Sequence, residues 1–206
     1  MKGFSLHISI APKAERPFPA KEILWGSQEG GQTLFPTAIA AYERKYSNDP
    51  VPMQKFSKAV ANAQERIWIV DEYLLIPDSG KPARRIEQIL TWLPLWLAAS
   101  DIRLLTKHHQ EIDEDDLKKF QLRAQAISNQ AVRREKECRI EIRGHLTRDC
   151  DFVHDRFAII DDELWHFGGT VGGFHSKVSA ASRGWRASEH GAISFFEEIW
   201  NAGERK

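Results

Sequence analysis

The chain has 206 residues, enough to bury the core of one domain with an extension, or of two small domains. Lysine and arginine together number 29, and so do aspartate and glutamate. This balance excludes the overall basic field that draws a whole protein surface to nucleic acid or anionic lipid, so any contact with a polyanion must be local.

Residues 1–54 contain one strand candidate, FSLHISI, and one short helix, TAIAAYERKY. Pro50 and Pro52 interrupt any helix that continues beyond this point. We therefore place a boundary near residue 54, between an N-terminal extension over residues 1–54 and a larger unit over residues 55–206.

From residue 55 onward, helices and strands alternate. A helix is predicted in SKAVANAQE, a strand in RIWIVDEYLL, a helix through ARRIEQILTWLPLWLAA and a strand at IRLLT. The apolar run 89–99 is about half as long as a bilayer requires, so it indicates the buried end of a helix and no transmembrane segment.

Residues 111–135 carry apolar side chains at helical spacing, with acidic residues in the first turn and basic ones in the last, as the helix dipole favours. The strand CRIEIRG follows. FVHDRFAII and LWHF then form a hairpin with its turn at residues 161–163, and HGAISFF is the last strand candidate. This order predicts an α/β fold, a mixed β-sheet flanked by helices.

The cysteines, Cys138 and Cys150, together with an N-terminus that lacks the pattern of a signal peptide, favour a reducing and cytoplasmic setting. We expect two partly buried free thiols. The tryptophans stand mostly at apolar positions and are expected to lie in the core.

The stretch FVHDRFAII carries His154 and Arg156 on one face of an otherwise apolar strand. Both faces become apolar within four residues, so the strand is expected to be covered on both sides. Two ionisable groups at its start must then border a cleft, because full burial would carry a desolvation penalty.

His154-x-Arg156, four further residues, Asp161 and then a strand ending at Gly168-Gly169 resemble the signature of the phospholipase D superfamily, His-x-Lys-x4-Asp followed by Gly-Ser-x-Asn. IWIVDEYLL is similar to the opening strand of that family, so the resemblance covers roughly residues 55–203. It implies a phospholipase-D-like half-unit in which one histidine attacks phosphorus and a second protonates the leaving oxygen, with no metal or other cofactor. A single motif per chain implies a homodimer in which each copy contributes His154.

Three positions depart from the family pattern, since Arg156 replaces its lysine, Gly169 its serine and Val171 its asparagine. Arginine still binds phosphate, but through a larger, permanently charged fork. Thr170 and the backbone of the glycine run 168–173 are candidates to supply the lost polar contacts. The His-Asp-Arg spelling also resembles the phospholipase-D-like module at the end of some MIT-domain proteins, which binds membranes and partners and is not an enzyme.

Seven extended residues span about 20 Å, so Asp161 is too far from His154 to orient its imidazole within one subunit. We expect Asp161 to cap backbone amides at the hairpin turn. Glu189 is our candidate for the orienting acid, because nucleases of the superfamily with one motif per chain carry a similar Ser-Glu-Asn before their last strand. The alternative for Glu189 is an exposed acid with no such role.

Arg183 and Arg186 flank Trp185 in SRGWR, which is either a site for a phosphate backbone with a stacked base or an anchor of a loop. Asp71, after the IWIV strand, is a candidate to reach the cleft from a neighbouring strand. The second His-x-Lys, residues 175–177, lacks the aspartate and is taken as a coincidence.

The remaining histidines predict no metal site. His108 and His109 are adjacent and point apart, and no cysteine or carboxylate stands at ligand spacing nearby. His145 and His166 are expected at strand ends on the rim of the cleft or simply on the surface.

Two functions follow as hypotheses. The first is a metal-independent phosphodiesterase, with a nuclease as its leading case, acting as a homodimer on nucleic acid or another phosphodiester. Its catalytic residues would be His154, Arg156 and Glu189, and its substrate would contact Gly169, Thr170, Arg183 and Arg186, while Asp161 and Gly168 serve the structure. The second is an inactive phospholipase-D-like module that binds a phosphate-bearing ligand or a protein partner in a larger assembly.

Overall fold

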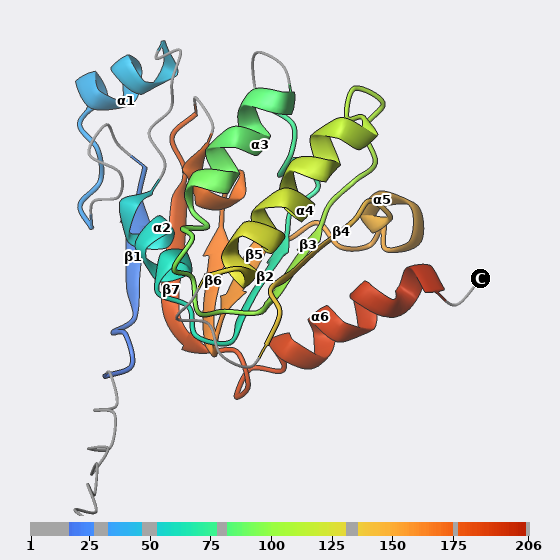
Figure 1. The fold of residues 1–206 in the computed structure, drawn as a ribbon. Coiled ribbons are helices and arrows are strands. Elements are labelled where there is room, and N and C mark those ends of the chain that lie inside the picture. Colours follow the sequence, from blue (N-terminus) through green and yellow to red (C-terminus); the bar gives the residue numbers. More distant parts are fainter. Residues whose placement is uncertain are drawn as a thin grey trace, which may run out of the picture.

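The computed structural model describes residues 17–26, 33–46, 53–77, 82–130, 136–174 and 177–204, which build one seven-stranded sheet with helices on both faces (Figure 1). The strand order is β1-β7-β6-β5-β2-β3-β4. The β2, β3 and β4 strands are parallel, and every other neighbouring pair is antiparallel. The predicted α/β fold, a mixed sheet flanked by helices, is confirmed.

The strands are β1 (Glu22–Trp25), β2 (Arg66–Val70), β3 (Asp101–Leu105), β4 (Arg139–Arg143), β5 (Phe157–Ile160), β6 (Glu163–Phe167) and β7 (Ala180–Arg186). The helices are α1 (Ala38–Lys45), α2 (Gln54–Ala61), α3 (Pro82–Thr91), α4 (Glu114–Ser128), α5 (Leu146–Asp149) and α6 (Ala192–Asn201), with 3-10 turns at Val171–Gly173 and Ala202–Glu204. Among the described residues, no helix is long and apolar enough to cross a membrane.

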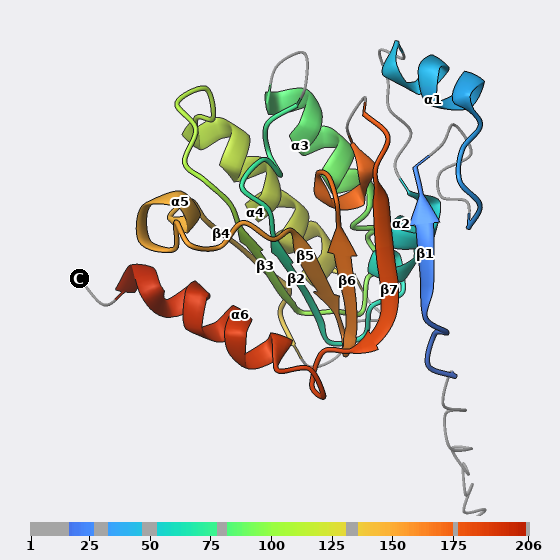
Figure 2. The ribbon, with the colours of Figure 1, turned by 180° about the vertical axis from the view of Figure 1, so that it is seen from behind.

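Alternating side chains of the central strands enter two separate cores. In β2, Ile67 and Ile69 belong to the core under α2, α3 and α4, whereas Trp68 and Val70 belong to the core under α5 and α6. Figure 2 shows α6 on the face opposite to α3 and α4. Burial on both faces explains why these strands appear in the sequence as continuous apolar runs.

The apolar run HGAISFF predicted a strand, and this prediction is wrong. The segment forms the start of helix α6. Phe196, Ile199 and Trp200 of α6 are buried against the sheet at helical spacing, and the Phe196 ring stacks on Trp68 with centroids 4.7 Å apart. A short apolar run fits a strand and a helix equally well. The uncovered face of the sheet, which needs an amphipathic helix, decides between them here.

Three other predicted elements within the described residues are clearly shorter than expected. The β2 strand ends at Val70, where the sequence predicted a strand through residue 75. The β5 strand begins only at Phe157, and residues 153–156 have no regular structure. The α3 helix ends at Thr91, where the sequence predicted a helix through residue 99. Trp92 is buried after it, but Trp96 is 78% exposed and lies outside the core. Pro94 lies between them and does not allow the helix to continue.

The N-terminal part of the chain contributes one strand to the sheet. The strand candidate at residues 4–10 lies outside the described residues, and β1 forms instead at residues 22–25, antiparallel to β7. The predicted helix TAIAAYERKY corresponds to α1. SRGWR lies in β7 and is therefore not a loop.

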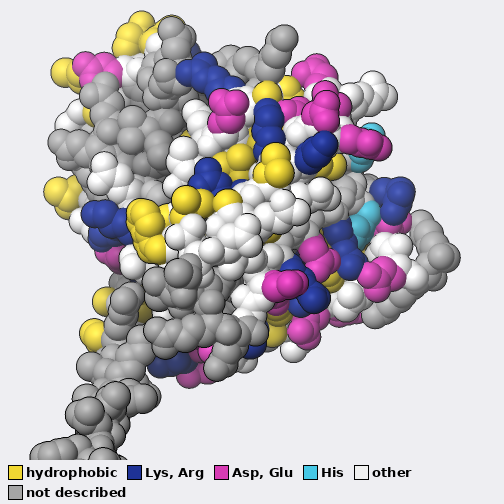
Figure 3. Space-filling view, in the orientation of Figure 1, with side chains coloured by type: hydrophobic (Ala, Val, Ile, Leu, Met, Phe, Trp, Pro, Cys, Tyr) yellow, Lys and Arg dark blue, Asp and Glu magenta, His cyan; other side chains and the backbone are white. Residues whose placement is uncertain are grey.

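Figure 3 shows basic and acidic side chains interspersed over the face that carries α3 and α4. This distribution agrees with the equal counts of the two charge types in the sequence. Cys138 and Cys150 are buried free thiols.

Candidate active site

The candidate site lies at one edge of the sheet, where three segments meet. β5 is antiparallel to both β2 and β6, so the end of β2, the start of β5 and the end of β6 lie at the same edge. These ends carry Asp71, Glu72 and Tyr73 after β2, residues 154–156 before β5, and the glycine run after β6. The sheet therefore gathers segments of the sequence that are far apart.

Arg156 lies between two carboxylates at this edge. Its Nε is 3.6 Å from Asp71 Oδ1, and one terminal nitrogen is 3.6 Å from Glu72 Oε1. These distances exceed those of direct hydrogen bonds. The Nε atom is buried and has no hydrogen-bond partner in the described part of the chain, and 21% of the side chain is exposed. The two carboxylates therefore position the guanidinium by charge attraction without forming direct hydrogen bonds to it.

A second cation, Lys107, contacts the same aromatic ring as Arg156. The Arg156 guanidinium lies 5.1 Å from the centroid of the Tyr73 ring, and Lys107 Nζ lies 3.8 Å from the same centroid. Lys107 follows β3, the parallel neighbour of β2. Neither Tyr73 nor Lys107 was predicted from the sequence, although the parallel pairing of β2 and β3 places the ends of these strands side by side.

Asp71, expected to reach the cleft from a neighbouring strand, does so from a fully buried position. Its carboxylate accepts hydrogen bonds from the backbone amides of Tyr73 at 2.9 Å and Val171 at 2.8 Å. Burial raises the pKa of this carboxyl from 3.8 to about 6. The two amides and the positive charges of Arg156 and Arg85 offset only part of that rise. Asp71 therefore ties β2 to the glycine run and changes its charge near neutral pH.

His154 is exposed, and its imidazole has no hydrogen-bond or ion-pair partner within the described ranges. The next residue, Asp155, places a carboxylate oxygen 2.8 Å from His166 Nδ1. His166 lies in β6 directly opposite Phe157. The segment before β5 thus carries the imidazole of His154 and the Asp155–His166 pair on either side of Arg156 in the chain. The Asp155–His166 pair was not predicted because it depends on the register of the β5–β6 hairpin.

Most of the glycine run 168–173 is buried. Thr170 is buried, the Val171 amide is bound to Asp71, and the carbonyl of Gly172 accepts a hydrogen bond from the Met53 amide at 2.8 Å. Gly172 has a φ of 83°, and a Cβ there would overlap the Trp92 ring. Only Gly168 and Gly169 at its start remain accessible, and the Gly168 amide donates to Ala180.

Arg183 and Arg186 form ion pairs away from His154. Arg183 binds both carboxylate oxygens of Glu163, at 2.7 and 3.0 Å, and Arg186 lies 3.2 Å from Asp162. Arg186 is level with Glu163 at the turn end of the hairpin, whereas Phe157 and His166 mark the other end. Both arginines hold β7 to this hairpin.

Glu189 also lies at the turn end. It is 3.7 Å from Arg186, and the preceding Ser188 binds Asp162 through its amide and its hydroxyl. The structure therefore does not bring Glu189 to His154 within one chain. The carboxylates at this end of the sheet belong to Asp155, which follows His154 in the chain, and to Asp71 and Glu72, which flank Arg156.

Asp161 lies at the turn itself, with a φ of 57°. Its carboxylate accepts hydrogen bonds from the backbone amides of Gln64, Glu65 and Arg66, at distances between 2.7 and 3.2 Å. These contacts join the hairpin to the start of β2. Asp161 is thus a capping residue at the edge of the sheet opposite to His154.

The other histidines are not gathered at the site. His145 is buried, with Nε2 3.0 Å from the carbonyl of Ile199, so it lies neither on the rim nor on the surface. His108 is exposed on a loop. No group of three or more histidine, cysteine, aspartate or glutamate residues that could hold a metal occurs among the residues described.

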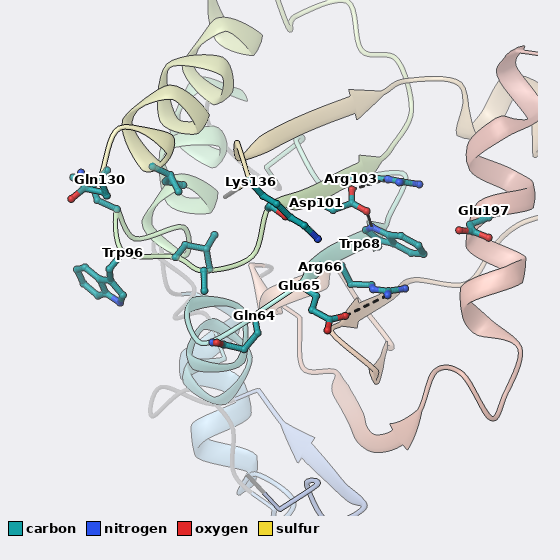
Figure 4. A pocket seen from close by; sticks show the side chains of 15 residues that line it. Gln64, Glu65, Arg66, Trp68, Trp96, Asp101, Arg103, Gln130, Lys136 and Glu197 are labelled. Atoms are coloured by element: carbon teal, nitrogen blue, oxygen red, sulfur yellow. Dashed lines mark hydrogen bonds and ion pairs between the residues drawn. The ribbon is translucent and has the colours of Figure 1, made fainter. Parts of the chain in front are cut away.

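A larger hollow of about 790 Å³ lies at the opposite end of β2 (Figure 4). Arg66 and Arg103 lie over the Trp68 ring there, 4.9 and 4.7 Å from its centroid. Arg103 is 2.8 Å from Asp101, and Arg66 is 3.6 Å from Glu65. Because the arginines are matched by carboxylates, this hollow shows no preference for an anionic ligand.

No family model and no curated protein matches this sequence. Among solved structures, the chain is similar to TrmBL2, an archaeal chromatin protein whose structure shows a novel mode of DNA binding, with 13% identity and a TM-score of 0.41. That match covers 92% of this chain and 55% of TrmBL2, so the chain spans about half the length of that protein. It is also similar to NucT from Helicobacter pylori, with 9% identity and a TM-score of 0.44, over 89% of this chain and 98% of NucT. At these values neither likeness carries an argument about family or activity.

Proposed function

We propose that the chain is a metal-independent phosphodiesterase that acts on nucleic acid, with His154 as the nucleophile and Arg156 as the phosphate ligand. The observation that carries the proposal is that an exposed imidazole and a partly exposed guanidinium stand two residues apart at one edge of the sheet, and that neither side chain has a hydrogen-bond partner among the described residues. An imidazole titrates near neutrality and is therefore able to act as a nucleophile.

The reaction would proceed in two displacements. A nitrogen of His154 bonds to phosphorus, and the bond from phosphorus to the leaving oxygen breaks while a second imidazole donates a proton to that oxygen. Water then attacks phosphorus and loses a proton to the second imidazole, while the bond from phosphorus to His154 breaks, which frees His154 and releases the phosphate ester. We assign the second imidazole to His154 of a second copy. Arg156 and Lys107 would stabilise the negative charge that develops on the nonbridging oxygens.

The surroundings of Arg156 favour a second candidate, a module that binds a phosphate-bearing ligand or a partner without catalysis. Two carboxylates, Asp71 and Glu72, flank the guanidinium at 3.6 Å and oppose an incoming anion. Gly169 and Val171 offer no side-chain donor to phosphate, and Asp71 already binds the Val171 amide. In this case Arg156 organises the surface and His154 only contacts the ligand.

Hydrolysis in the presence of EDTA tests the first candidate. Single-stranded DNA, RNA and bis(p-nitrophenyl) phosphate are incubated with the full chain, with His154→Ala and with the matched control His108→Ala, which removes an exposed loop histidine. We expect hydrolysis by the full chain, a loss of more than about a thousandfold in His154→Ala, and no change in His108→Ala. Equal rates for His154→Ala and the full chain would contradict the assignment of the nucleophile. Absence of hydrolysis together with His154-dependent binding of the same strands would favour the second candidate.

A further inference from the structure

A pocket of about 390 Å³ opens beside the candidate site, on the face of the sheet that carries α6. Its walls include the rings of Phe157 from β5, Trp185 from β7 and Phe195 from α6. Figure 2 shows that α6 starts next to the end of β7 and runs away from that strand across this face. The pocket is lined by residues of β5, β6 and β7 and of the first turn of α6.

Asp155 lines the pocket and lies between His154 and Arg156 in the chain, so the pocket borders the candidate site. The Cα atom of each of these two neighbours is only about 3.8 Å from that of Asp155. Its carboxylate also fixes His166, which lines the same pocket. A group bound in the pocket would therefore be a close neighbour of a phosphate held at His154 and Arg156.

The lining of the pocket selects a neutral, flat group. The residues that line it include no lysine or arginine, and the one charged side chain among them is Asp155. Lys21 Nζ lies over the Trp185 ring, 5.4 Å from its centroid. The lining itself therefore favours a neutral group over a phosphate. Ser182, His166 and His190 add a few hydrogen-bonding groups to walls that are otherwise apolar and aromatic. Pockets of a few hundred Å³ with this composition are typical sites for small organic groups. Aromatic walls bind any nucleobase by stacking, because every base has a π-face.

We propose that this pocket binds a nucleobase of the nucleic acid whose phosphate lies at His154 and Arg156. The inference rests on the proposed function for its phosphate site, and it adds that the substrate is a single strand with an unpaired base next to that phosphate. A base inside a duplex is stacked and paired, so it would have to leave the helix to reach the pocket.

Binding without hydrolysis tests the pocket separately from catalysis. A labelled single-stranded oligonucleotide and the same strand with abasic sites are titrated by fluorescence anisotropy into the full-length His154→Ala variant. We expect the abasic strand to bind about tenfold more weakly, as loss of one stacked base implies. Adding Phe195→Ala should reduce this difference to less than about twofold, as the stacking wall is lost. Adding Trp96→Ala, which removes an exposed aromatic ring at the other end of β2, should leave the difference unchanged.

His190→Ala provides a second variant, because His190 is exposed at the rim and its removal does not disturb the core. It should weaken binding of the intact strand more than binding of the abasic strand. Equal affinities for the two strands, or a base effect that survives both Phe195→Ala and His190→Ala, would overturn the inference. Conversion of a dimer into a monomer by Phe195→Ala, with no change in the base effect, would also overturn it and show that a second copy covers the pocket.

The two proposals fail in different ways. A base effect on binding in a chain that hydrolyses nothing would refute the phosphodiesterase and leave the pocket assigned. Hydrolysis at equal rates on intact and abasic strands would support the phosphodiesterase and refute the pocket.

Discussion

At the scale of single residues, Arg156 separates the two candidate functions. In a working phosphodiester site, Arg156→Lys restores the residue of the family that the motif resembles, so hydrolysis should persist or rise although one bidentate contact is lost. In a binding module, lysine cannot reproduce the planar fork, and affinity for a phosphorylated ligand should fall by about 1.5–3 kcal/mol. The hydrolysis rate and the affinity for the phosphorylated ligand are measured on one preparation. The matched control is Arg186→Lys, because the guanidinium of Arg186 pairs with Asp162. Unchanged binding with no hydrolysis in either form would contradict both candidates.

Asp71 should make the stability of the fold depend on pH. Its pKa is about 6 in the folded chain and 3.8 when unperturbed, so the folded state holds the proton more tightly than the unfolded state. The stabilising contribution of protonated Asp71 is fully present below about pH 3.8 and is lost as the pH rises through about 6, with a total of about 3 kcal/mol. Asp71→Asn should remove this contribution, and should also lower stability at every pH because an amide cannot accept from both backbone N–H groups in the same way.

Urea unfolding of Asp71→Asn and of the full chain between pH 3.5 and 7 measures the effect. The difference in unfolding free energy between the two proteins should be largest at low pH and should shrink toward pH 7. Asp151→Asn, the same substitution at an exposed position, serves as the control. A constant difference for Asp71→Asn would show that its pKa is not raised.

At the scale of elements, the β5–β6 hairpin is anchored by Asp161 to the segment that precedes β2. Asparagine tolerates the φ of 57° but offers one carbonyl oxygen in place of a carboxylate that accepts from three amides. Asp161→Asn should therefore lower the unfolding free energy by about 1–3 kcal/mol, with activity per folded molecule unchanged. Denaturant unfolding and hydrolysis assays on the same sample check this, again beside Asp151→Asn. A variant of normal stability that has lost all activity would refute a purely structural role.

At the scale of the whole molecule, the two-imidazole mechanism requires two copies of the chain. We expect sedimentation equilibrium to show a symmetric dimer at micromolar concentration, and mixing of inactive His154→Ala chains with active chains to lower the activity per active chain. An active monomer would contradict the two-copy mechanism. It would then point to His166, which Asp155 holds in the same chain, as the second imidazole.

The α/β alternation, the helical segment that forms α4 and the β5–β6 hairpin with its turn were all predicted from the sequence. Each of these rests on local signals, namely periodicity, dipole-compatible charges and turn residues, which act over a few residues. The resemblance of His154, Arg156 and Asp161 to a known motif was equally visible in the sequence. The division at residue 54 stays a prediction, although β1 pairs with β7 of the larger unit.

The helical state of α6 and the surroundings of the motif depend on contacts between distant segments, so they were not predicted from the sequence. The apolar residues of HGAISFF fit the spacing of a strand and that of a helix equally well. The segment is a helix because its apolar side packs on a face of the sheet that would otherwise be exposed. The partners of Arg156 come from the end of β2, more than eighty residues earlier in the chain, and those of Arg183, Arg186 and Glu189 depend on which end of the hairpin β7 reaches. Ion-pair partners follow from the register and direction of strands, which are set when the sheet closes on its cores, so no local pattern predicts them.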